Sequence, residues 1–467
     1  MPSQKKTKQN IGFVRTEVAP LLPPPPSEAG ITGWLYHNIF QSMSDFSSAA
    51  ATVKSVLMAL LTLIIAYVGI GQLWALLDFA IFSAVWTPQE GVKREVCLTT
   101  EQGGELPAGW HGACWPFIYA KFKFIVYGAF DNNQLWRVNL AGFIGLVALA
   151  WVMIENLPYR KHAGIFLLVV YPIITLILLT GGNFDTDYSE VGMTVIIGLA
   201  LITIGRQATA GRLGTTIKEV AIVFALSGWS MVVYAVIAAI VGLDYGLTEI
   251  GTNNWGGLLV TLVVAVTGIV ASLPLGILLA LGRRSQMPVA RIMSTLFIEF
   301  WRGVPLITVL FMASVMLPLF LPEGVNFDNL LRALIGVMLF SAAYMAEVVR
   351  GGLQAMDKGQ FEGADALGLS YWQSMRLIIL PQSLTHVIPG IVNTFIGLFK
   401  DTTLVSIVGI FDMLGAIQST YSDAAWGTPV QDETGYLFIC AIYFVFCFGM
   451  SRYSMFMEYK LSTSRKN

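Results

Sequence analysis

The sequence predicts an all-α membrane protein, a polytopic bundle of about ten transmembrane helices. Hydrophobic residues make up 55% of the 467 residues and charged residues only 12%, whereas a soluble domain carries about 25% charged residues. The mean hydropathy is +0.67. A chain of this composition cannot cover its apolar surface in water, and lipid is the solvent that suits it. Collagen-like, nucleic-acid-binding, disulfide-scaffold and soluble-enzyme classes are therefore excluded.

Long apolar runs predict the individual spans, because a helix needs about 20 apolar residues to cross a bilayer. The fourth run is the shortest. The ten runs are 54–80, 138–155, 163–180, 191–205, 219–242, 257–282, 292–320, 331–350, 383–411 and 434–451. An even number of spans places both termini on the same side of the membrane.

The distribution of Lys and Arg predicts which side that is. Twenty of the 28 basic residues lie on the side of the N-terminal tail, and four of the five opposite loops have essentially none. The fifth opposite loop, 87–137, carries five, but long loops are translocated largely regardless of their charge. We therefore expect both termini in the cytoplasm and the loop 87–137 outside.

Three parts are expected along the chain. Residues 1–50 form a polar cytoplasmic tail with a run of prolines at 23–26, typical of a polyproline segment. Residues 51–250 form a transmembrane extension with few intramembrane charges, and residues 251–467 contain almost all of the informative motifs. Within the tail, five apolar residues predict a helix lying on the membrane surface, with an irregular loop as the alternative: Trp34, Leu35, Ile39, Met43 and Phe46.

Four cysteines and four histidines give few candidates for chemistry. Cys440 and Cys447 lie in the last run and are expected to be small apolar filler. Cys97 and Cys114 share the long outer loop, where an oxidising compartment would allow a disulfide, with two free thiols as the alternative. The histidines are scattered without metal-binding spacing, so no metal site is predicted.

The loop between the eighth and ninth runs is similar to the coupling-loop motif of ABC importer permeases. Its pattern is E-A-A, three residues, G, nine residues, then I-x-L-P, and only Gly363 departs from it, standing where the motif has Ala. A short helix is expected, since Glu362 suits the first turn and Gly368 can end it. An ordinary interfacial loop is the alternative. The matching residues are Glu362, Gly363, Ala364, Asp365, Ala366, Leu367, Gly368, Ile378, Leu380 and Pro381.

Three flanking stretches resemble polar amino-acid permeases in particular. Residues 300–306 (FWRGVPL) resemble F-R-G-T-P-L, residues 343–352 resemble A-Y-x-A-E-I-x-R-G-G, and residues 399–406 resemble K-D-T-S-L-x-S with Thr403 in place of Ser. The resemblance covers about residues 255–465, a five-helix permease core of the type I ABC importers. The extended first half is similar to the longer permease subunits of general L-amino-acid ABC importers.

This resemblance implies a permease subunit in the bacterial inner membrane. Two permease subunits pair, commonly two different ones, a periplasmic binding protein delivers the amino acid, and two ATPase subunits dock on the coupling segments. ATP and Mg²⁺ are expected on the partner ATPase and no cofactor on this chain, which has no G-x-x-x-x-G-K-[ST] phosphate loop. Neither an enzymatic activity nor a nucleic-acid partner is expected.

Charged residues inside the apolar runs are candidates for the substrate pathway, because a charge at bilayer depth costs about 2.5–3.5 kcal/mol. Glu299 with Arg302, and Glu347 with Arg350, are spaced to pair on one helix face, so structural ion pairs are the alternative. The 400–403 segment interrupts an apolar run, and a broken helix there would suit a ligand site. The predicted pathway residues are Glu299, Arg302, Glu347, Arg350, Lys400, Asp401, Thr402 and Thr403.

Three other functions remain open at the level of sequence. An ion-coupled secondary transporter would use the same charges as ion sites, although the coupling motif argues against it. A membrane-embedded enzyme would need a metal or nucleophile motif, and none is visible. A structural permease beside a substrate-binding partner would have the same motifs as a substrate-binding subunit.

Overall fold

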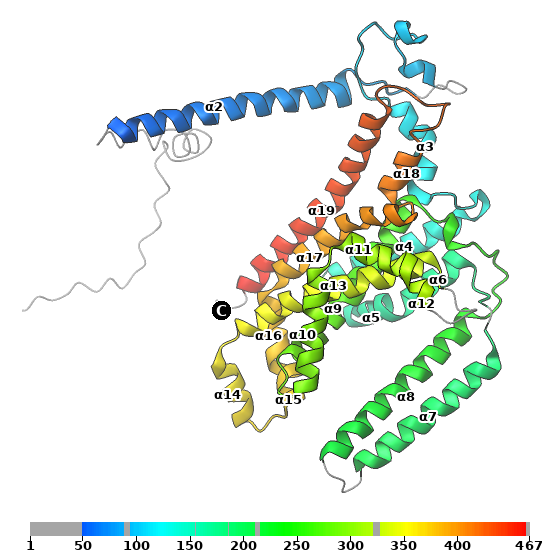
Figure 1. The fold of residues 1–467 in the computed structure, drawn as a ribbon, viewed down its shortest axis with the longest axis vertical. Helices are drawn as coiled ribbons and strands as arrows, with labels where there is room; N and C mark the ends of the chain where they lie inside the picture. Colours follow the sequence, from blue (N-terminus) through cyan, green and yellow to red (C-terminus); the bar gives the residue numbers. More distant parts are fainter. Residues whose placement is uncertain are drawn as a thin grey trace, which may run out of the picture. The chain divides into compact units, whose positions relative to one another are not determined.

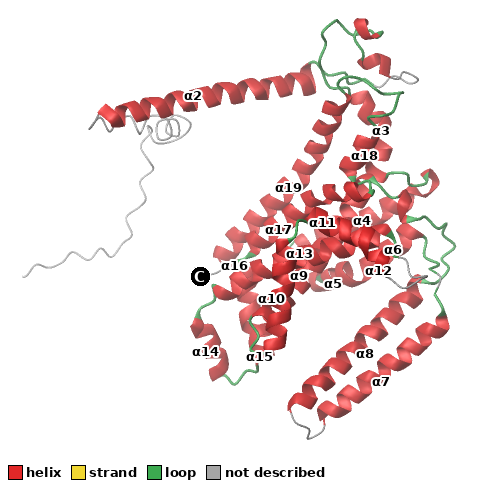
Figure 2. Cartoon of the chain, in the orientation of Figure 1, coloured by secondary structure: helices red, strands yellow, loops and turns green. Residues whose placement is uncertain are grey.

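The computed structural model describes residues 49–87, 94–154, 156–184, 186–210, 215–320 and 327–463. Within these ranges every regular element is a helix, and the only β-pairing is a few isolated bridges (Figure 2). The expected all-α membrane fold is confirmed. The expected polyproline segment and surface helix lie outside the described residues. The chain divides into two compact units, Met1–Ser83 and Ala84–Asn467.

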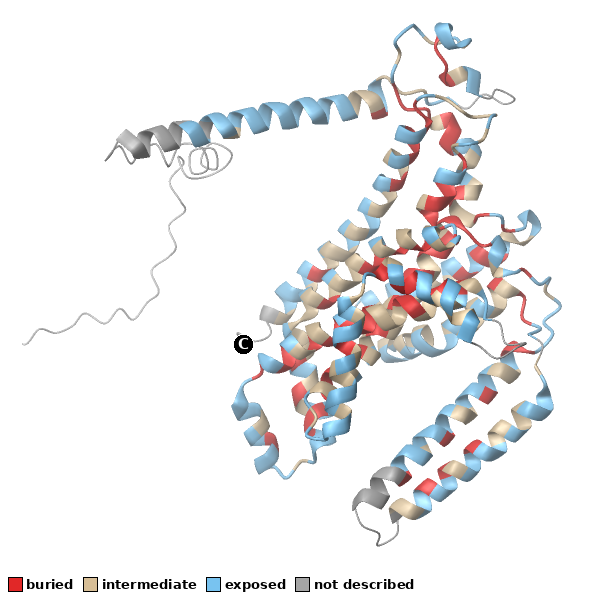
Figure 3. Cartoon of the chain, viewed as in Figure 1, coloured by how far each residue is buried: buried red, intermediate tan, exposed pale blue. Residues whose placement is uncertain are grey.

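The first unit contains one long helix, α2 (Ala49–Leu77), which continues into a π-helical turn, η3 (Asp78–Phe82). Almost all of its described side chains are exposed (Figure 3). A helix that is apolar all round is typical of a membrane span.

The second unit begins with the outer-loop segment and four predicted spans (Figure 1). The short fourth run is confirmed as a full-length helix. The elements are α3 (Trp115–Tyr127), α4 (Leu135–Met153), α5 (Arg160–Ile165), η7 (Phe166–Val170), α6 (Tyr171–Thr180), α7 (Tyr188–Ala210) and α8 (Thr215–Val241). Helices α7 and α8 pack closely through glycines, since a Cβ on Gly228 would lie 2.4 Å from the Gly198 carbonyl oxygen.

The remaining helices form the permease-like part. They are α9 (Gly257–Arg283), α10 (Pro288–Gly303), α11 (Leu306–Phe311), η9 (Met312–Met316), α12 (Leu317–Phe320), α13 (Asn329–Gln354), α14 (Lys358–Ala366), α15 (Tyr371–Ser374), η10 (Met375–Ile379), α16 (Leu380–His386), α17 (Ile388–Asp401), η11 (Thr402–Val408), α18 (Met413–Ser419) and α19 (Gln431–Thr463). Helix α3 packs against α9, α18 and α19. The expected division near residue 250 stays a prediction, and this segment of the extension crosses it.

The seventh predicted span, 292–320, is wrong as a single helix. Among the described residues nine helices are long and apolar enough to cross a membrane, and the pair Pro288–Gly303 and Leu306–Phe320 is bent by 104°. The bend follows from Pro305, which has no N–H to donate and holds Val304 in an extended conformation (φ −108°, ψ 132°). An apolar count across 292–320 does not register this break.

Helices α9 and α13 run parallel, and their direction determines how many times the bent pair between them crosses the membrane. A Cβ on Gly268 would lie 3.2 Å from Val337 Cγ1, and one on Gly276 would lie 2.7 Å from Met345 Cβ. Residue numbers therefore rise together along the two helices. Parallel helices in one membrane need an odd number of crossings between them, so the bent pair makes one crossing.

The path of the bent pair along α13 agrees with one crossing. Arg302 lies near Glu347, with 3.8 Å between Arg302 Nη1 and Glu347 Oε2. Further along, Val309 lies beside Gly336, and Arg332 donates a hydrogen bond to the Ser314 carbonyl. The pair thus climbs α13 from its last third to its first turn. We call the end at which α9 and α13 finish the α14 end, and the opposite one the α3 end.

The ninth predicted span also differs from expectation. It was expected to begin near residue 383, but the helix is interrupted at Val387 (φ −112°, ψ 11°), where α16 ends and α17 begins with Pro389 in its first turn. Near Lys400 the α-helix ends, at Asp401, but the chain passes directly into the tighter 3-10 turns of η11 at Thr402 without an extended interruption.

Candidate functional site: a charge cluster, a polar helix end and the exposed α14 segment

Five charged side chains from three helices meet towards the α14 end. We call them the charge cluster: Arg283, Glu299, Arg302, Glu347 and Arg350. Glu347 on α13 is at the centre, because its Oε1 accepts from Arg283 Nη1 at 2.7 Å and its Oε2 accepts from Arg350 Nη2 at 2.7 Å. Arg283 Nη2 also donates to Glu299 Oε1 at 2.7 Å. The cluster therefore ties α9, α10 and α13 together.

The structure revises the pairing expected inside this cluster. The Glu347–Arg350 pair is confirmed. The Glu299–Arg302 pair is wrong, because Glu299 bonds to Arg283 and Arg302 faces Glu347. The sequence placed Arg283 in a loop, since it follows an apolar run. The only feature of the sequence that could have indicated a role for Arg283 was its position at the end of a helix, where a cation is favourable.

The charges of the cluster do not cancel, since three guanidinium groups face two carboxylates. Arg302 is the least engaged of the three cations. Its nearest carboxylate atom, Glu347 Oε2, is 3.8 Å away, beyond hydrogen-bonding distance, and its guanidinium lies 5.7 Å from the centre of the Tyr344 ring. A third anion, such as the carboxylate of an amino acid, would find its best partner at Arg302.

The polar residues at the end of α17 lie at a different depth. A Cβ on Gly268 would touch both Leu398 and Val337, which puts Leu398 level with Val337. Val337 precedes Glu347 by ten residues on α13, or about 15 Å at the rise of an α-helix. Lys400 and Asp401 come after Leu398 and are further still from the cluster. The predicted pathway residues thus form two groups and not one.

The two threonines of this segment bond within their own helix end. Thr402 Oγ1 donates to Phe399 O at 2.8 Å, and Thr403 Oγ1 donates to Lys400 O at 2.9 Å. Thr402 is buried and lies 3.3 Å from Tyr443 Oη on α19. Of the segment's polar groups, Lys400, Asp401 and Thr403 are the more accessible.

The segment that resembles the coupling motif forms a short helix, α14, that projects from the bundle (Figure 1). Five of its matched residues and Gly368 are exposed, and Leu367 is 74% exposed. Ala364, by contrast, is 1% exposed. It faces inward and anchors the helix. Trp372, 65% exposed, extends the apolar surface beside Leu367.

Gly368 ends this segment in the left-handed conformation. Its φ is +68°, and its N–H donates to Asp365 O at 2.9 Å, while the Leu369 N–H donates to Ala364 O at 3.2 Å. These bonds satisfy carbonyls at the helix end, which is the usual role of a glycine at this position. The last motif residues follow in η10 and α16: Ile378, Leu380 and Pro381.

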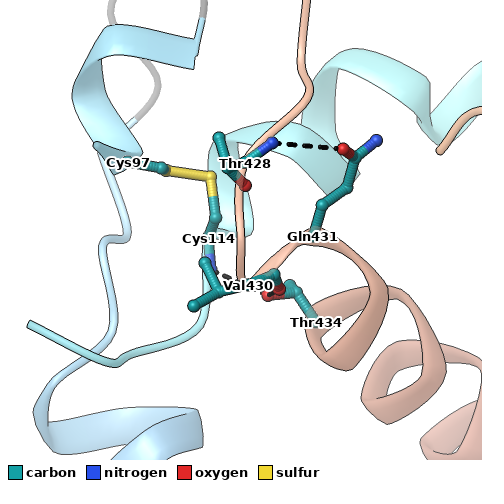
Figure 4. The surroundings of a disulfide bond; sticks show 6 residues. All are labelled: Cys97, Cys114, Thr428, Val430, Gln431 and Thr434. Atoms are coloured by element: carbon teal, nitrogen blue, oxygen red, sulfur yellow. Dashed lines mark hydrogen bonds between the residues drawn. A yellow bond between two sulfur atoms is a disulfide. The ribbon is translucent and has the colours of Figure 1, made fainter. Parts of the chain in front are cut away.

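The predicted disulfide is confirmed. Cys97 and Cys114 are bonded and buried (Figure 4). The Cys114 N–H donates to Thr434 Oγ1 of α19 at 3.0 Å, and the Arg94 N–H donates to Ala425 O at 3.3 Å. The bridge closes a loop within the outer segment, and the two hydrogen bonds fasten that segment to the first turn of α19 and to the residues that precede it.

Two buried ionisable residues near the α3 end were not predicted. Asp412 is 0% exposed and accepts hydrogen bonds from the N–H groups of Leu414 and Gly415, and burial raises its pKa to about 6. Arg137, expected in the outer loop, is buried at the start of α4, where its Nε donates to Leu178 O at 2.5 Å and its Nη1 to Thr248 O at 2.8 Å. The only feature of the sequence that could have indicated the burial of Arg137 was its position directly before the apolar run 138–155.

Other candidate sites are weaker. In the described part of the chain no three potential ligands among His, Cys, Asp and Glu are placed to hold a metal ion. One open cavity of about 340 Å³ lies between the loops flanking α7 and α8, apart from the charge cluster. Its lining residues are Asn183, Phe184, Thr186, Tyr188, Gly242 and Glu249.

Two known proteins are similar to this sequence over almost its full length. Residues 272–455 match the family described as binding-protein-dependent transport system inner membrane component. The chain is 41% identical over 440 residues to the inner membrane amino-acid ABC transporter permease protein YhdY of Escherichia coli (strain K12), covering 92% of this chain and 93% of the relative. It is also 41% identical over 463 residues to the glutamate/glutamine/aspartate/asparagine transport system permease protein BztC of Rhodobacter capsulatus, covering 98% and 100%. A crystal structure of an amino acid ABC transporter with histidines matches at 29% identity and a TM-score of 0.39, covering 44% of this chain and 92% of that one.

Proposed function

Because this chain belongs to the family of amino-acid ABC transporter permeases, we propose that it forms the translocation pathway through which ATP hydrolysis on separate subunits drives amino acids into the cytoplasm. The observation that carries this function is 41% identity to amino-acid permeases over nearly the full length of the chain, together with an exposed α14 that matches the coupling motif. The chain is a multi-pass inner membrane protein and acts in transport and not as an enzyme.

We propose that two ATPase subunits, a second and different permease subunit, and a periplasmic amino-acid-binding protein complete the transporter. The apolar surface around Leu367 and Trp372 supports ATPase docking at α14, because exposed aromatic and aliphatic side chains on a soluble loop favour burial by a partner. ATP and Mg²⁺ would bind the partner, since the sequence has no phosphate loop. The α14 end, with both termini, would then face the cytoplasm.

We propose that the substrate meets the two polar groups in turn. They lie about 15 Å or more apart along the helices, too far for one amino acid to bridge. Asp401 and Thr403, nearer the α3 end, would contact the substrate ammonium first. Arg302 of the charge cluster would receive the carboxylate later. The relative that is named for glutamate, glutamine, aspartate and asparagine makes acidic amino acids and their amides the first substrates to try.

Asp401→Asn tests this function in proteoliposomes that contain the assembled complex and its binding protein. The variant keeps the shape of the side chain and removes its charge, so we expect uptake to fall while basal ATP hydrolysis survives. Uptake by the wild type should persist when the proton gradient is collapsed and ATP is held constant. Loss of uptake under that condition would favour a secondary transporter, and normal transport by Asp401→Asn would favour a structural subunit.

A further inference from the structure

The last turn of α9 presents two adjacent arginines to different partners. Arg283 bonds to Glu299 and Glu347 of the charge cluster. Arg284 has other partners, since its Nη1 donates to the Leu353 carbonyl of α13 at 2.8 Å and its guanidinium carbon lies 5.5 Å from the centre of the Phe361 ring. Phe361 belongs to α14. A single helix turn therefore touches both the charge cluster and the segment proposed to bind the ATPase.

Phe361 is one of the few residues that hold α14 to the rest of the chain. Most of α14 is exposed, whereas Phe361 packs against the apolar cluster at the α14 end that includes Leu281, Leu353 and Met356. Leu353 is also the residue whose carbonyl holds Arg284. A displacement of α14 would reach α9 and α13 through this shared contact.

We propose that Arg284 is a positioning residue that transmits movement of α14 into the charge cluster. The link rests on the proposed function, because it supposes that an ATPase moves α14. A guanidinium stacked on a ring keeps its partner while the ring slides, and its bond to a backbone carbonyl makes the last turn of α9 follow. Arg283, one residue away, then shifts between Glu299 and Glu347, which changes how closely α10 approaches α13 and how Arg302 is held.

A purely stabilising role makes a different prediction. A cation at the end of α9 also complements the helix dipole, and loss of that effect alone would lower stability and the yield of assembled complex. It would not change the number of substrate molecules transported per ATP hydrolysed. The ratio of transport to hydrolysis is therefore the quantity that separates the two roles.

The experiment uses Arg284→Gln and Phe361→Leu in the reconstituted complex, with Arg291→Gln as the matched control. Arg291 is an exposed arginine in the first turn of α10 on the same side of the bundle. ATP hydrolysis and uptake of a labelled amino acid are measured in the same vesicles. We expect hydrolysis stimulated by the loaded binding protein to persist in both test variants, and transport per ATP to fall by about five-fold or more. The control should match the wild type.

The double variant makes the test independent of either single effect. If Arg284 and Phe361 act as one link, the double variant should lose no more transport per ATP than the more severely impaired single variant, whereas losses that multiply would overturn the link. An unchanged ratio in Phe361→Leu would also overturn it, even if Arg284→Gln failed to assemble. Absence of ATP-driven uptake by the wild-type complex would instead overturn the proposed function, and this link with it.

Discussion

Glu347 holds a position that no other side chain in the charge cluster could fill. Its two oxygens receive Arg283 and Arg350 separately, and Arg302 lies near the second oxygen. Its side chain is only 16% exposed. The Glu347 carboxylate is the counterion that allows three guanidinium groups to lie close together. Without a counterion, guanidinium groups repel one another and are costly to bury.

Replacing Glu347 by Gln should therefore destabilise the protein far more than the same change at Glu299. Glu299 is 55% exposed and bonds to one arginine, and an exposed ion pair contributes about 0–1 kcal/mol. Hydrogen bonds to a charged group contribute about 1.5–3 kcal/mol each, so Glu347→Gln should lower the unfolding free energy by at least about 2 kcal/mol. Thermal unfolding in detergent micelles measures both. Equal shifts in Tm for the two variants would show that the cluster does not depend on its central carboxylate.

Asp412 gives a second prediction for a single residue. Burial raises its pKa from 3.8 to about 6, so between these values the folded state binds more protons than the unfolded state. Stability should therefore fall as pH rises from about 4 to 6, by on the order of 3 kcal/mol for this group alone. Asp412→Asn, which still offers one oxygen to the start of α18, removes this dependence.

The difference between the pH profiles of the wild type and Asp412→Asn isolates the one carboxylate. Other acidic groups titrate in both proteins and cancel in the comparison. We expect the melting temperature of the variant to gain on that of the wild type as pH is raised from 4 to 6, and then to keep a constant offset. Parallel profiles over that range would mean that Asp412 is ionised at its ordinary pKa in the folded state.

At the scale of elements, α14 shows how local sequence sets a helix and its end. Gly363 lies inside the helix with an ordinary helical backbone, and Gly368 follows its end at a φ of +68°. An added Cβ at either position would meet nothing within 4 Å. The two glycines therefore differ in backbone conformation and not in space, which makes them a matched pair.

Alanine at these two positions should have opposite effects on α14. Gly363→Ala restores the motif residue and should stabilise the helix by up to about 1 kcal/mol, so uptake should be kept. Gly368→Ala places a side chain in the left-handed region and should weaken the helix end by about 1 kcal/mol. Hydrogen exchange of α14 peptides reads out both changes. Faster exchange in Gly363→Ala than in the wild type would contradict this account of the segment.

Elements with a local cause were the ones that could be predicted from the sequence. The α14 helix, its glycine end and the long apolar helices follow from residue spacing within each segment. The bend at Pro305 has a local cause as well, but counting apolar residues does not reveal it, because the residues on both sides of the proline remain apolar. The interruption at Val387 also has a local cause, and Pro389, in the first turn of α17, is the residue in the sequence that indicates it.

At the scale of the whole molecule, the partners of the charged residues could not be predicted. Glu299 and Arg302 are correctly spaced to pair, yet Arg283, contributed by another helix, takes Glu299. The separation of Asp401 from the charge cluster depends on how far α17 is shifted along α13. The sequence of neither helix determines this shift by itself. Tertiary packing decides both, and it overrides the local preference of a pair three residues apart.

The parallel course of α9 and α13 completes the topology. With the bent pair counted as one crossing, the described helices allow ten crossings, and we expect an even number of crossings to place the two termini on the same side. If the pair were re-entrant and made no crossing, α13 would be antiparallel to α9, contrary to the contacts at Gly268 and Gly276. The basic residues, which lie mainly on the predicted side of the tail, then predict that this side faces the cytoplasm.

Labelling with a membrane-impermeant maleimide tests the orientation and the disulfide together, in a background with Cys440 and Cys447 replaced by serine. We expect Cys97 and Cys114 to react from the periplasmic side only after reduction, because they form a buried bridge in the outer loop. A cysteine introduced at the exposed Ser370, just after α14, should react only once the cells are permeabilised. Labelling of Ser370→Cys in intact spheroplasts would place the α14 end outside, where no ATPase could reach it. That result would overturn the orientation and the proposed docking of the ATPase at once, whereas reaction of Cys97 and Cys114 without reductant would overturn only the disulfide.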